Sequence, residues 1–447
     1  MTATIEPKAA APSTGGTPSK AGAPSTGGTP SKAGAPSKAV AAGGLILGLS
    51  VMVATAGNYL LNILLGRWLS PAEFSDATLM VTLMLTLSSL ALCLQLVTAR
   101  FVGIQPRGAG TARLVVRLRW WSWSLGTAVG AIMAALAIRW QMLFHTSSAW
   151  PFVILGAAIP FYLAQAVSRG VLQGQLRFGR LSASLIIEMV VRVGIGAGLV
   201  AAGAGVVGAT VGLAASLIAT WLFVRGQGTI AAGEHTPTPA GVGAYLGSVA
   251  VLLAAQVIIT NSDVLIAKTY LVPATAGAYA AVALMGRAVF FLSWAAATVV
   301  FPAVARRHAD GGDTRALLVG GIAAVTGLGM VCTIGALVAG GPILGALIGP
   351  AYAHLSGPLA LYALLTTVFA IANLFATHHL STGRVRESWL MLCGAAVQTT
   401  ALLVWHDTIA RLIQAQLAAV AVLLIAVLTS HFMTTKHHPS KNLRRTF

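Results

Sequence analysis

Residues 57–74, GNYLLNILLGRWLSPAEF, decide the fold, because their pattern returns in the second half of the chain as residues 261–279, NSDVLIAKTYLVPATAGAY. In both stretches a polar residue precedes a base by five positions, and a proline follows the base. These residues are Asn62, Arg67 and Pro71 in the first copy and Asp263, Lys268 and Pro273 in the second. A motif that occurs twice in one hydrophobic chain predicts a duplicated transporter, whose two bundles face each other across a central path.

The composition indicates that lipid surrounds most of the chain. Of its 447 residues, 57% are hydrophobic and only 9% are charged, which is more apolar surface than a soluble protein of this length can bury. The net charge of +18 does not predict nucleic-acid binding, because the bases lie in short loops between apolar runs. Cys93, Cys332 and Cys393 lie within apolar runs without metal-ligand spacing, so we expect them to pack, and we expect no metal or cofactor.

The N-terminal residues 1–38 are expected to form a disordered cytoplasmic tail. The segment APSTGGTPSKAG occurs there twice in tandem, at 11–22 and 23–34. A segment so rich in Pro, Gly, Ser and Thr cannot bury enough apolar surface to fold. It contains no apolar run, so we do not expect it to act as a signal peptide.

Twelve apolar segments follow the tail, each of roughly the length, about 20 residues, that crosses a hydrocarbon core. In lipid these segments must be helices, because the residues between them are too few for the alternating strands of a barrel. They are predicted at 40–66, 77–99, 120–140, 150–173, 181–202, 205–224, 244–271, 275–303, 316–338, 356–379, 388–405 and 409–432.

The distribution of bases supports this count and orients the chain. With the N-terminus inside, 22 of the 28 lysines and arginines lie on the cytoplasmic side, including Arg169 after the fourth span. The exceptions are Arg67, Arg139, Lys268 and Arg411 outside, and Arg192 and Arg287 within spans. We therefore expect a multi-pass protein of the cytoplasmic membrane with both termini in the cytoplasm.

The predicted fold class is an all-α integral membrane protein with about 12 transmembrane helices in two six-helix bundles. Because six spans per half is an even number, both halves enter from the same side, and their pseudo-twofold axis runs along the membrane normal. The expected parts are the tail 1–38, an N-terminal bundle 39–225, a cytoplasmic linker 226–243, a C-terminal bundle 244–433 and a basic cytoplasmic tail 434–447.

A set of short segments along residues 42–430 gives the chain a family resemblance. They are LLGRWLSPAEF (64–74), TARF (98–101), GQLRFGRLS (174–182), NSDVLIAKTYL (261–271), PATAGAYAAV (273–282), FPAVARR (301–307), LGALIGPAYA (344–353) and GRVR (383–386). Together they resemble polysaccharide-biosynthesis flippases of the Wzx type. These belong to the superfamily (MOP) that also contains lipid II flippases and MATE drug exporters. Ser75 departs from the family, which commonly has glycine there.

The resemblance implies a mechanism and a substrate. Two six-helix bundles would rock about a central cavity and carry a polyprenyl-diphosphate-linked oligosaccharide from the cytoplasm to the exterior. The partners implied are this lipid-linked sugar, membrane lipid, and the polysaccharide polymerase and glycosyltransferases of the same synthesis. The residues themselves ask for a similar path, because a sugar diphosphate needs bases for its phosphates and polar side chains for its hydroxyls.

Four charges deep within predicted spans are the main site candidates. They are Glu188, Arg192, Asp263 and Arg287. Each costs roughly 3 kcal/mol at the bilayer centre unless it is paired or hydrated. Arg287 has no acid one turn away on its own helix, so we expect another helix to supply its partner, with Asp263 the internal choice, or a ligand to do so.

The other candidates leave two readings open. Glu188 and Arg192 share one helix face and could be a structural pair or a switch released by a proton or by substrate. Asn58 and Asn62 also share a face and could join helices or contact a headgroup. Asp263 with Asn261, and Glu188, are candidates for ion coupling, whereas the simpler reading of the first two is a helix end.

Three classes of function compete. A lipid-linked oligosaccharide flippase is favoured, and a MATE-like exporter of cationic drugs or another lipid transporter is the alternative. The exporter would require net acid in the cavity, where two arginines meet two acids. A membrane glycosyltransferase is disfavoured, because its paired carboxylates would have to come from the outside acids Glu73, Asp76 and Asp407, which are well separated. We therefore expect no enzymatic activity and no catalytic residue.

Overall fold

The computed structural model describes residues 38–104, 109–227, 242–288, 315–381 and 386–436, and within these ranges the chain is helical, with no strand. The predicted terminal tails and linker lie almost entirely outside the described ranges. The helices are α1 (Lys38–Trp68), α2 (Pro71–Ile104), α3 (Ala109–Ala135), α4 (Ala137–Phe144), α5 (Trp150–Gly174), α6 (Phe178–Ala201), α7 (Gly205–Val224), α8 (Val242–Tyr270), a helix over 273–288, α10 (Arg315–Leu347), the 3₁₀ turn η1 (Pro350–Tyr352), α11 (Ser356–Ser381), α12 (Arg386–Val404) and α13 (Ile409–Lys436).

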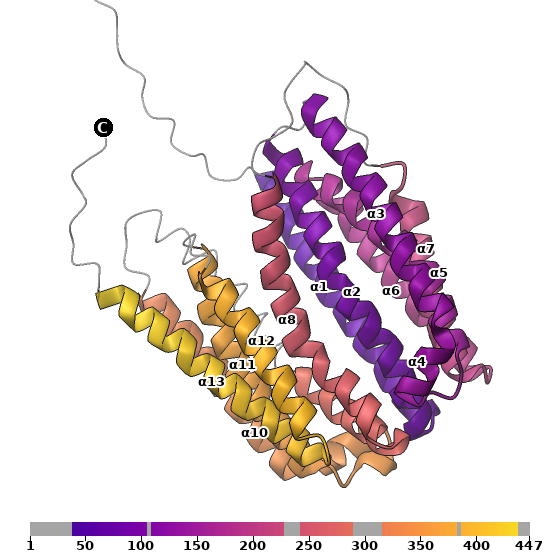
Figure 1. Cartoon of the computed structure of the whole chain (residues 1–447), viewed down its shortest axis with the longest axis vertical. Coiled ribbons are helices and arrows are strands. Elements are labelled where there is room, and N and C mark those ends of the chain that lie inside the picture. The colour runs from indigo at the N-terminus through magenta and orange to yellow at the C-terminus, as the bar shows by residue number, and fades with distance from the viewer. Residues whose placement is uncertain (1–37, 105–108, 228–241, 289–314, 382–385, 437–447) are drawn as a thin grey trace, which may run out of the picture.

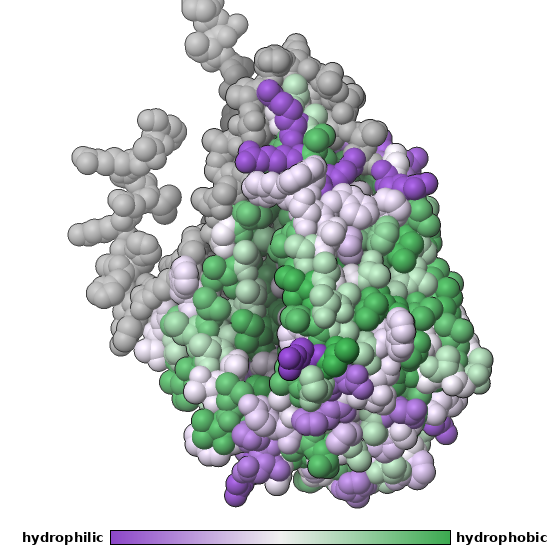
Figure 2. Space-filling model, turned by 45° about the vertical axis from the view of Figure 1, so that its right-hand side comes forward, coloured by the Kyte–Doolittle hydropathy of each residue, from purple (hydrophilic) through white to green (hydrophobic). Residues whose placement is uncertain are grey.

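Every predicted span coincides with a helix or a pair of helices over its described residues. Among the described residues, nine helices are long and apolar enough to cross a membrane, or up to ten if the bent pair α3–α4 is one span. The span predicted at 120–140 is that pair, which bends by 64° between Ala135 and Ala137. The chain is therefore a multi-span, all-helical membrane protein, and Figure 2 shows the apolar band across the middle of its surface.

The turn between α1 and α2 shows how local sequence sets a helix boundary. The Ser70 hydroxyl accepts a hydrogen bond from the Glu73 N–H at 3.3 Å, and the Glu73 carboxylate accepts one from the Ser70 N–H at 3.0 Å. This reciprocal pair is a capping box, and Pro71 stands at the first helical position, where its missing N–H costs nothing. The second copy of the motif has the same form, because α8 ends at Tyr270 and the next helix starts at Pro273.

The helices form two groups joined through α8. In the first group α1 packs on α6, α6 on α7, and α5 on α2, α3 and α7. In the second, α10 packs on α11, and α13 packs on α11 and α12. Helix α8 packs on both α2 and α12, so it lies along the seam between the groups (Figure 1).

The two ends of the molecule differ. At one end, which we call the terminal end, α1 begins and α13 finishes, and there the two groups lean apart (Figure 1). At the other, the closed end, the start of α2 lies against the helix over 273–288, through Pro71 and Gly277, and against η1, through Phe74 and Tyr352. Arg67 Nη1 donates to the carbonyl oxygen of Ala346 across this end at 2.8 Å, so the two groups are in direct contact there.

Three charged residues lie elsewhere than the sequence predicts. Arg169 lies within α5, not in a loop, and is 8% exposed. Lys268 and Asp76 are not separated loop residues, because Lys268 is 2% exposed in α8 and pairs with Asp76 of α2, which is 4% exposed. The sequence-based prediction was wrong for all three for the same reason. A charged residue near the end of an apolar run is assigned to a loop unless its buried partner is known.

Candidate functional site

A cavity of about 410 Å³ lies between the two helix groups. Its wall is mainly apolar and includes uncharged polar side chains from both groups, among them Asn58, Asn62 and Thr260. The only charged side chains that line it in the described part of the chain are Arg192 from α6 and Arg287 from the helix over 273–288. Each half of the chain thus contributes one arginine to the same space.

Arg192 belongs to a network of buried groups in the first half. Its Nη2 lies 2.5 Å from Glu188 Oε1, as their spacing of four on one helix predicts. Its Nη1 donates to Asn58 Oδ1 at 3.1 Å, and its Nε donates to Ser216 Oγ at 3.3 Å. Helices α1, α6 and α7 therefore hold one guanidinium at the cavity wall.

Arg169 is a member of this network that the sequence analysis did not place there. Its Nη2 lies 2.7 Å from Glu188 Oε2, and its Nε donates to Ser184 Oγ at 3.1 Å. Glu188 therefore sits between two arginines, and Arg169, which does not line the cavity, is the one behind it. A signal was present in the sequence, because the predicted span 150–173 includes position 169, although the charge of Arg169 was counted with the loop that follows this span.

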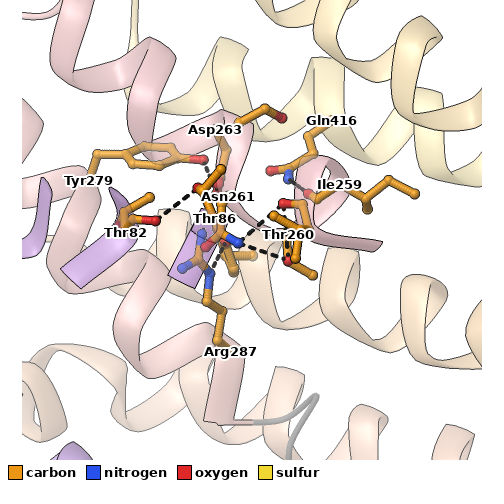
Figure 3. A network of polar contacts seen from close by, with 12 residues as sticks. Thr82, Thr86, Ile259, Thr260, Asn261, Asp263, Tyr279, Arg287 and Gln416 are labelled. Carbon is orange, nitrogen blue, oxygen red and sulfur yellow. Dashed lines mark hydrogen bonds and ion pairs between the residues drawn. The ribbon is translucent and has the colours of Figure 1, made fainter. Parts of the chain in front are cut away.

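The second half holds its buried acid differently. Asp263 is 0% exposed, and Arg287 Nη2 lies 2.8 Å from its Oδ1, so Asp263 is the partner of Arg287 that the sequence suggests. The hydroxyls of Tyr279 and Tyr362 donate to Asp263 Oδ2 at 2.9 Å and 2.7 Å. Figure 3 shows Tyr279 and Arg287 converging on Asp263 from the helix after α8. The tyrosines were not singled out from sequence, where they read as packing residues.

Three asparagines singled out from the sequence lie at the cavity. Asn58 and Asn62 both line the cavity, and Asn62 Nδ2 donates to the Asn58 carbonyl oxygen at 2.8 Å. Asn261 also lines it, and its Nδ2 donates to the carbonyl oxygen of Val257 at 3.1 Å. The three donors to Asp263 are Tyr279, Tyr362 and Arg287, whereas the Asn261 amide points to the backbone of its own helix.

The arrangement gives the cavity a positive wall. Both acids lie behind it: neither Glu188 nor Asp263 lines the space that their arginines face. The first-half cluster of Arg169, Glu188 and Arg192 carries one excess positive charge, whereas Arg287 and Asp263 balance. Guanidinium groups bind carboxylate and phosphate oxygens through two parallel hydrogen bonds, so this wall is suited to an anionic group.

Comparisons with known proteins give a fold and no closer relative. No protein-family model matches the chain, and no curated protein does. An inward-facing MATE-family multidrug resistance transporter of the MOP superfamily matches with a TM-score of 0.67 at 15% identity, over 88% of this chain and 98% of that one. The lipid II flippase MurJ, in an inward closed conformation, matches with a TM-score of 0.66 at 13% identity, over 89% and 88%.

A third solved structure also shares the fold. It is a MOP superfamily transporter from Pyrococcus furiosus, whose description says that the reverse polarity of its binding pocket suggests a different function. It matches with a TM-score of 0.57 at 17% identity, over 90% of this chain and 96% of that one. All these neighbours are transporters and none is an enzyme. At these identities the likeness shows the fold alone: the chain has the fold shared by multidrug and lipid-flipping transporters of the MOP superfamily.

Proposed function

We propose that the protein flips a polyprenyl-diphosphate-linked oligosaccharide across the cytoplasmic membrane by alternating access, in the synthesis of a cell-surface polysaccharide. The observation that carries the proposal is the pair Arg192 and Arg287, which alone among the described cavity-lining residues are charged. They come from opposite halves and face one space. A diphosphate presents several anionic oxygens to two such forks, whereas a cationic drug would meet repulsion at both.

The rest of the cavity wall suits a sugar headgroup. Asn58, Asn62 and Thr260 bring amide and hydroxyl groups that exchange hydrogen bonds with sugar hydroxyls. A headgroup of this kind cannot cross hydrocarbon unaided, and the cavity offers it polar partners near the middle of the helices.

The finer topology is part of the proposal. Twelve spans in two six-helix bundles, with domain bounds 39–225 and 244–433, would place both termini in the cytoplasm. Helix ends at the terminal end are rich in bases such as Arg113, Arg117 and Arg180, as expected of the cytoplasmic side. In this orientation the terminal end, where the groups lean apart, would face the cytoplasm, and the closed end would face outside, as in an inward-facing state.

Coupling to an ion remains part of the proposal at Glu188, Asp263 and Asn261. Both acids are fully engaged in this conformation, so a proton or cation could reach either only when an arginine or a tyrosine leaves it. A polymerase and glycosyltransferases are the partners that would supply and consume the lipid-linked sugar.

The test is transport by the purified protein in liposomes. A fluorescent polyprenyl-diphosphate oligosaccharide should become accessible to an external quencher faster than a neutral glycolipid with the same sugar. Arg192→Lys and Arg287→Lys should each slow this markedly, because lysine cannot form two parallel bonds to phosphate. The matched control is Arg411→Lys, since Arg411 pairs with Asp407 on the surface and is 61% exposed. Equal flipping of the neutral lipid, or uptake of a cationic dye instead, would contradict the proposal.

A further inference from the structure

The two copies of the sequence motif meet at the closed end. Gly277, in the second copy, lies so close to the first that a Cβ there would clash with the carbonyl oxygen of Pro71. The Phe74 and Tyr352 rings pack edge to face with centroids 6.2 Å apart, and a Cβ at Gly66 would clash with Ile348. These contacts show that tight apolar packing between the two halves closes this end.

One ion pair is buried inside this closure. Lys268 Nζ lies 2.6 Å from Asp76 Oδ1, and it also donates to Ser75 Oγ at 2.7 Å. The Lys268 and Asp76 side chains are 2% and 5% exposed. The backbone N–H and the hydroxyl of Ser147 both donate to Asp76 Oδ2, at 3.0 Å and 2.9 Å. The pair joins α8 of the second half to α2 of the first, and no step of the proposed headgroup binding uses it.

The physical chemistry of such a pair is unlike that of an apolar contact. Taking two charges out of water carries a desolvation cost that their attraction only partly offsets, so apolar replacements of a buried pair are often more stable than the pair itself. If the closed end opens, both charges regain water. The pair therefore makes the closed end less stable, relative to its open form, than apolar packing alone would.

We propose that the buried pair of Lys268 and Asp76 lowers the stability of the closed end. The closed end can then open during transport, so that the cavity becomes accessible from that side. The proposal makes opposite predictions for single and double changes. Removing one charge leaves the other buried without its partner, which favours opening. Removing both takes away the desolvation cost, which favours closure. If the pair instead acted as a lock, meaning that it only stabilised the closed end, then both single variants and the double variant would open more often.

The inference rests on alternating access as proposed above but not on the substrate, so its test contains no glycolipid. Spin labels are placed at Trp68→Cys and Leu347→Cys, in a protein whose native cysteines are replaced. Both positions are exposed and flank the contact of Arg67 with Ala346 across the two groups. Pulsed measurements of the label-to-label distance in lipid nanodiscs then give the ratio of open to closed molecules.

The size of the effect expected for each variant depends on which hydrogen-bond partners the remaining buried charge keeps. Asp76→Asn leaves the buried Lys268 charge without an acid and with only the Ser75 hydroxyl that it already contacts, so it should raise the open-to-closed ratio roughly tenfold or more. Lys268→Met should raise it less, because Asp76 keeps its two bonds from Ser147. Asp76→Asn with Lys268→Met should lower the ratio below that of the unchanged protein. The matched control is Asp407→Asn with Arg411→Met, an exposed pair on one helix, which should leave the ratio unchanged.

Two outcomes would overturn the proposal. An open population in the double variant as large as in the single ones would make the pair a lock, and unchanged distances in both single variants would remove it from gating altogether. If a single variant does not fold, the double variant decides alone, since its ratio falls under this proposal and rises for a lock. Failure of glycolipid flipping in the liposome assay would leave this result standing.

Discussion

The two halves of the chain bury an acid beside the same cavity in different ways. In the first half, Glu188 lies between Arg169 and Arg192, at 2.7 Å and 2.5 Å. In the second half, Asp263 has one arginine and two tyrosine hydroxyls around it. The first solution leaves one excess positive charge near the cavity, and the second leaves none.

Both solutions keep the acid satisfied when the cavity arginine turns to a ligand. If Arg192 leaves Glu188, the carboxylate still has Arg169, and if Arg287 leaves Asp263, the two tyrosine hydroxyls remain. A buried carboxylate without any partner would make that exchange costly. Because the first half has an excess positive charge, Arg192 can leave Glu188 at a lower cost than Arg287 can leave Asp263. Arg192 should therefore give the larger share of anion affinity.

The largest effect is expected in the second half, where a single cation balances the acid. Arg287→Met leaves Asp263 buried without a cation, which should lower the free energy of unfolding by about 3–5 kcal/mol and nearly abolish flipping. Arg287→Met with Asp263→Asn should restore thermal stability, because both charges leave together. If Arg287 binds the headgroup, this double variant stays inactive in the liposome assay at normal abundance. Restored flipping would make Arg287 a structural partner only.

A smaller effect is expected at Arg169, which never lines the cavity. Arg169→Met leaves Arg192 as the only cation on Glu188, so a diphosphate must compete with the acid for it. Affinity for farnesyl diphosphate, measured by calorimetry on the purified protein, should fall about tenfold, or 1.4 kcal/mol.

The control for Arg169 separates competition from misfolding. Arg169→Met combined with Glu188→Gln should regain affinity, because no carboxylate then competes for Arg192. Arg169→Lys, which keeps the charge, should lose little. Affinity that stays low in the combined variant, with normal thermal unfolding, would show that the two arginines do not act through Glu188.

The smallest effect concerns the hydroxyls that take the place of a second arginine. Tyr279→Phe removes one hydrogen bond to a charged group, which should lower the free energy of unfolding by about 1.5–3 kcal/mol. Tyr362→Phe should cost more, because its oxygen also accepts from Arg287 Nε at 3.2 Å. Thermal unfolding measures the effect of both changes. Ser184→Ala is the matching change in the first half, because the Ser184 hydroxyl accepts a hydrogen bond from Arg169. Equal stability of Tyr279→Phe and the unchanged protein would mean that the Tyr279 hydroxyl adds nothing, and that Arg287 and Tyr362 hold Asp263.

The sequence predicts part of the candidate site for reasons that can be named. Glu188 and Arg192 were paired correctly because residues four apart on one helix share a face. Asp263 was identified as the partner of Arg287 because few acids lie within spans. Tyr279 and Tyr362 were not found, because a tyrosine in an apolar run has no distinguishing cost. A hydroxyl becomes a donor to a buried carboxylate only when two helices bring them together.

What the sequence alone determined is the set of helices and the repeated turn. Hydropathy and caps such as Ser70 with Glu73 act within one segment, so the helix positions could be read before any contact was known. The tertiary structure decided which face of each helix lies inside and which charges meet. The helices are apolar on nearly all sides, so their sequences carry little signal of rotation. The pairs Arg169 with Glu188 and Lys268 with Asp76 depend on that rotation, and only packing fixes it.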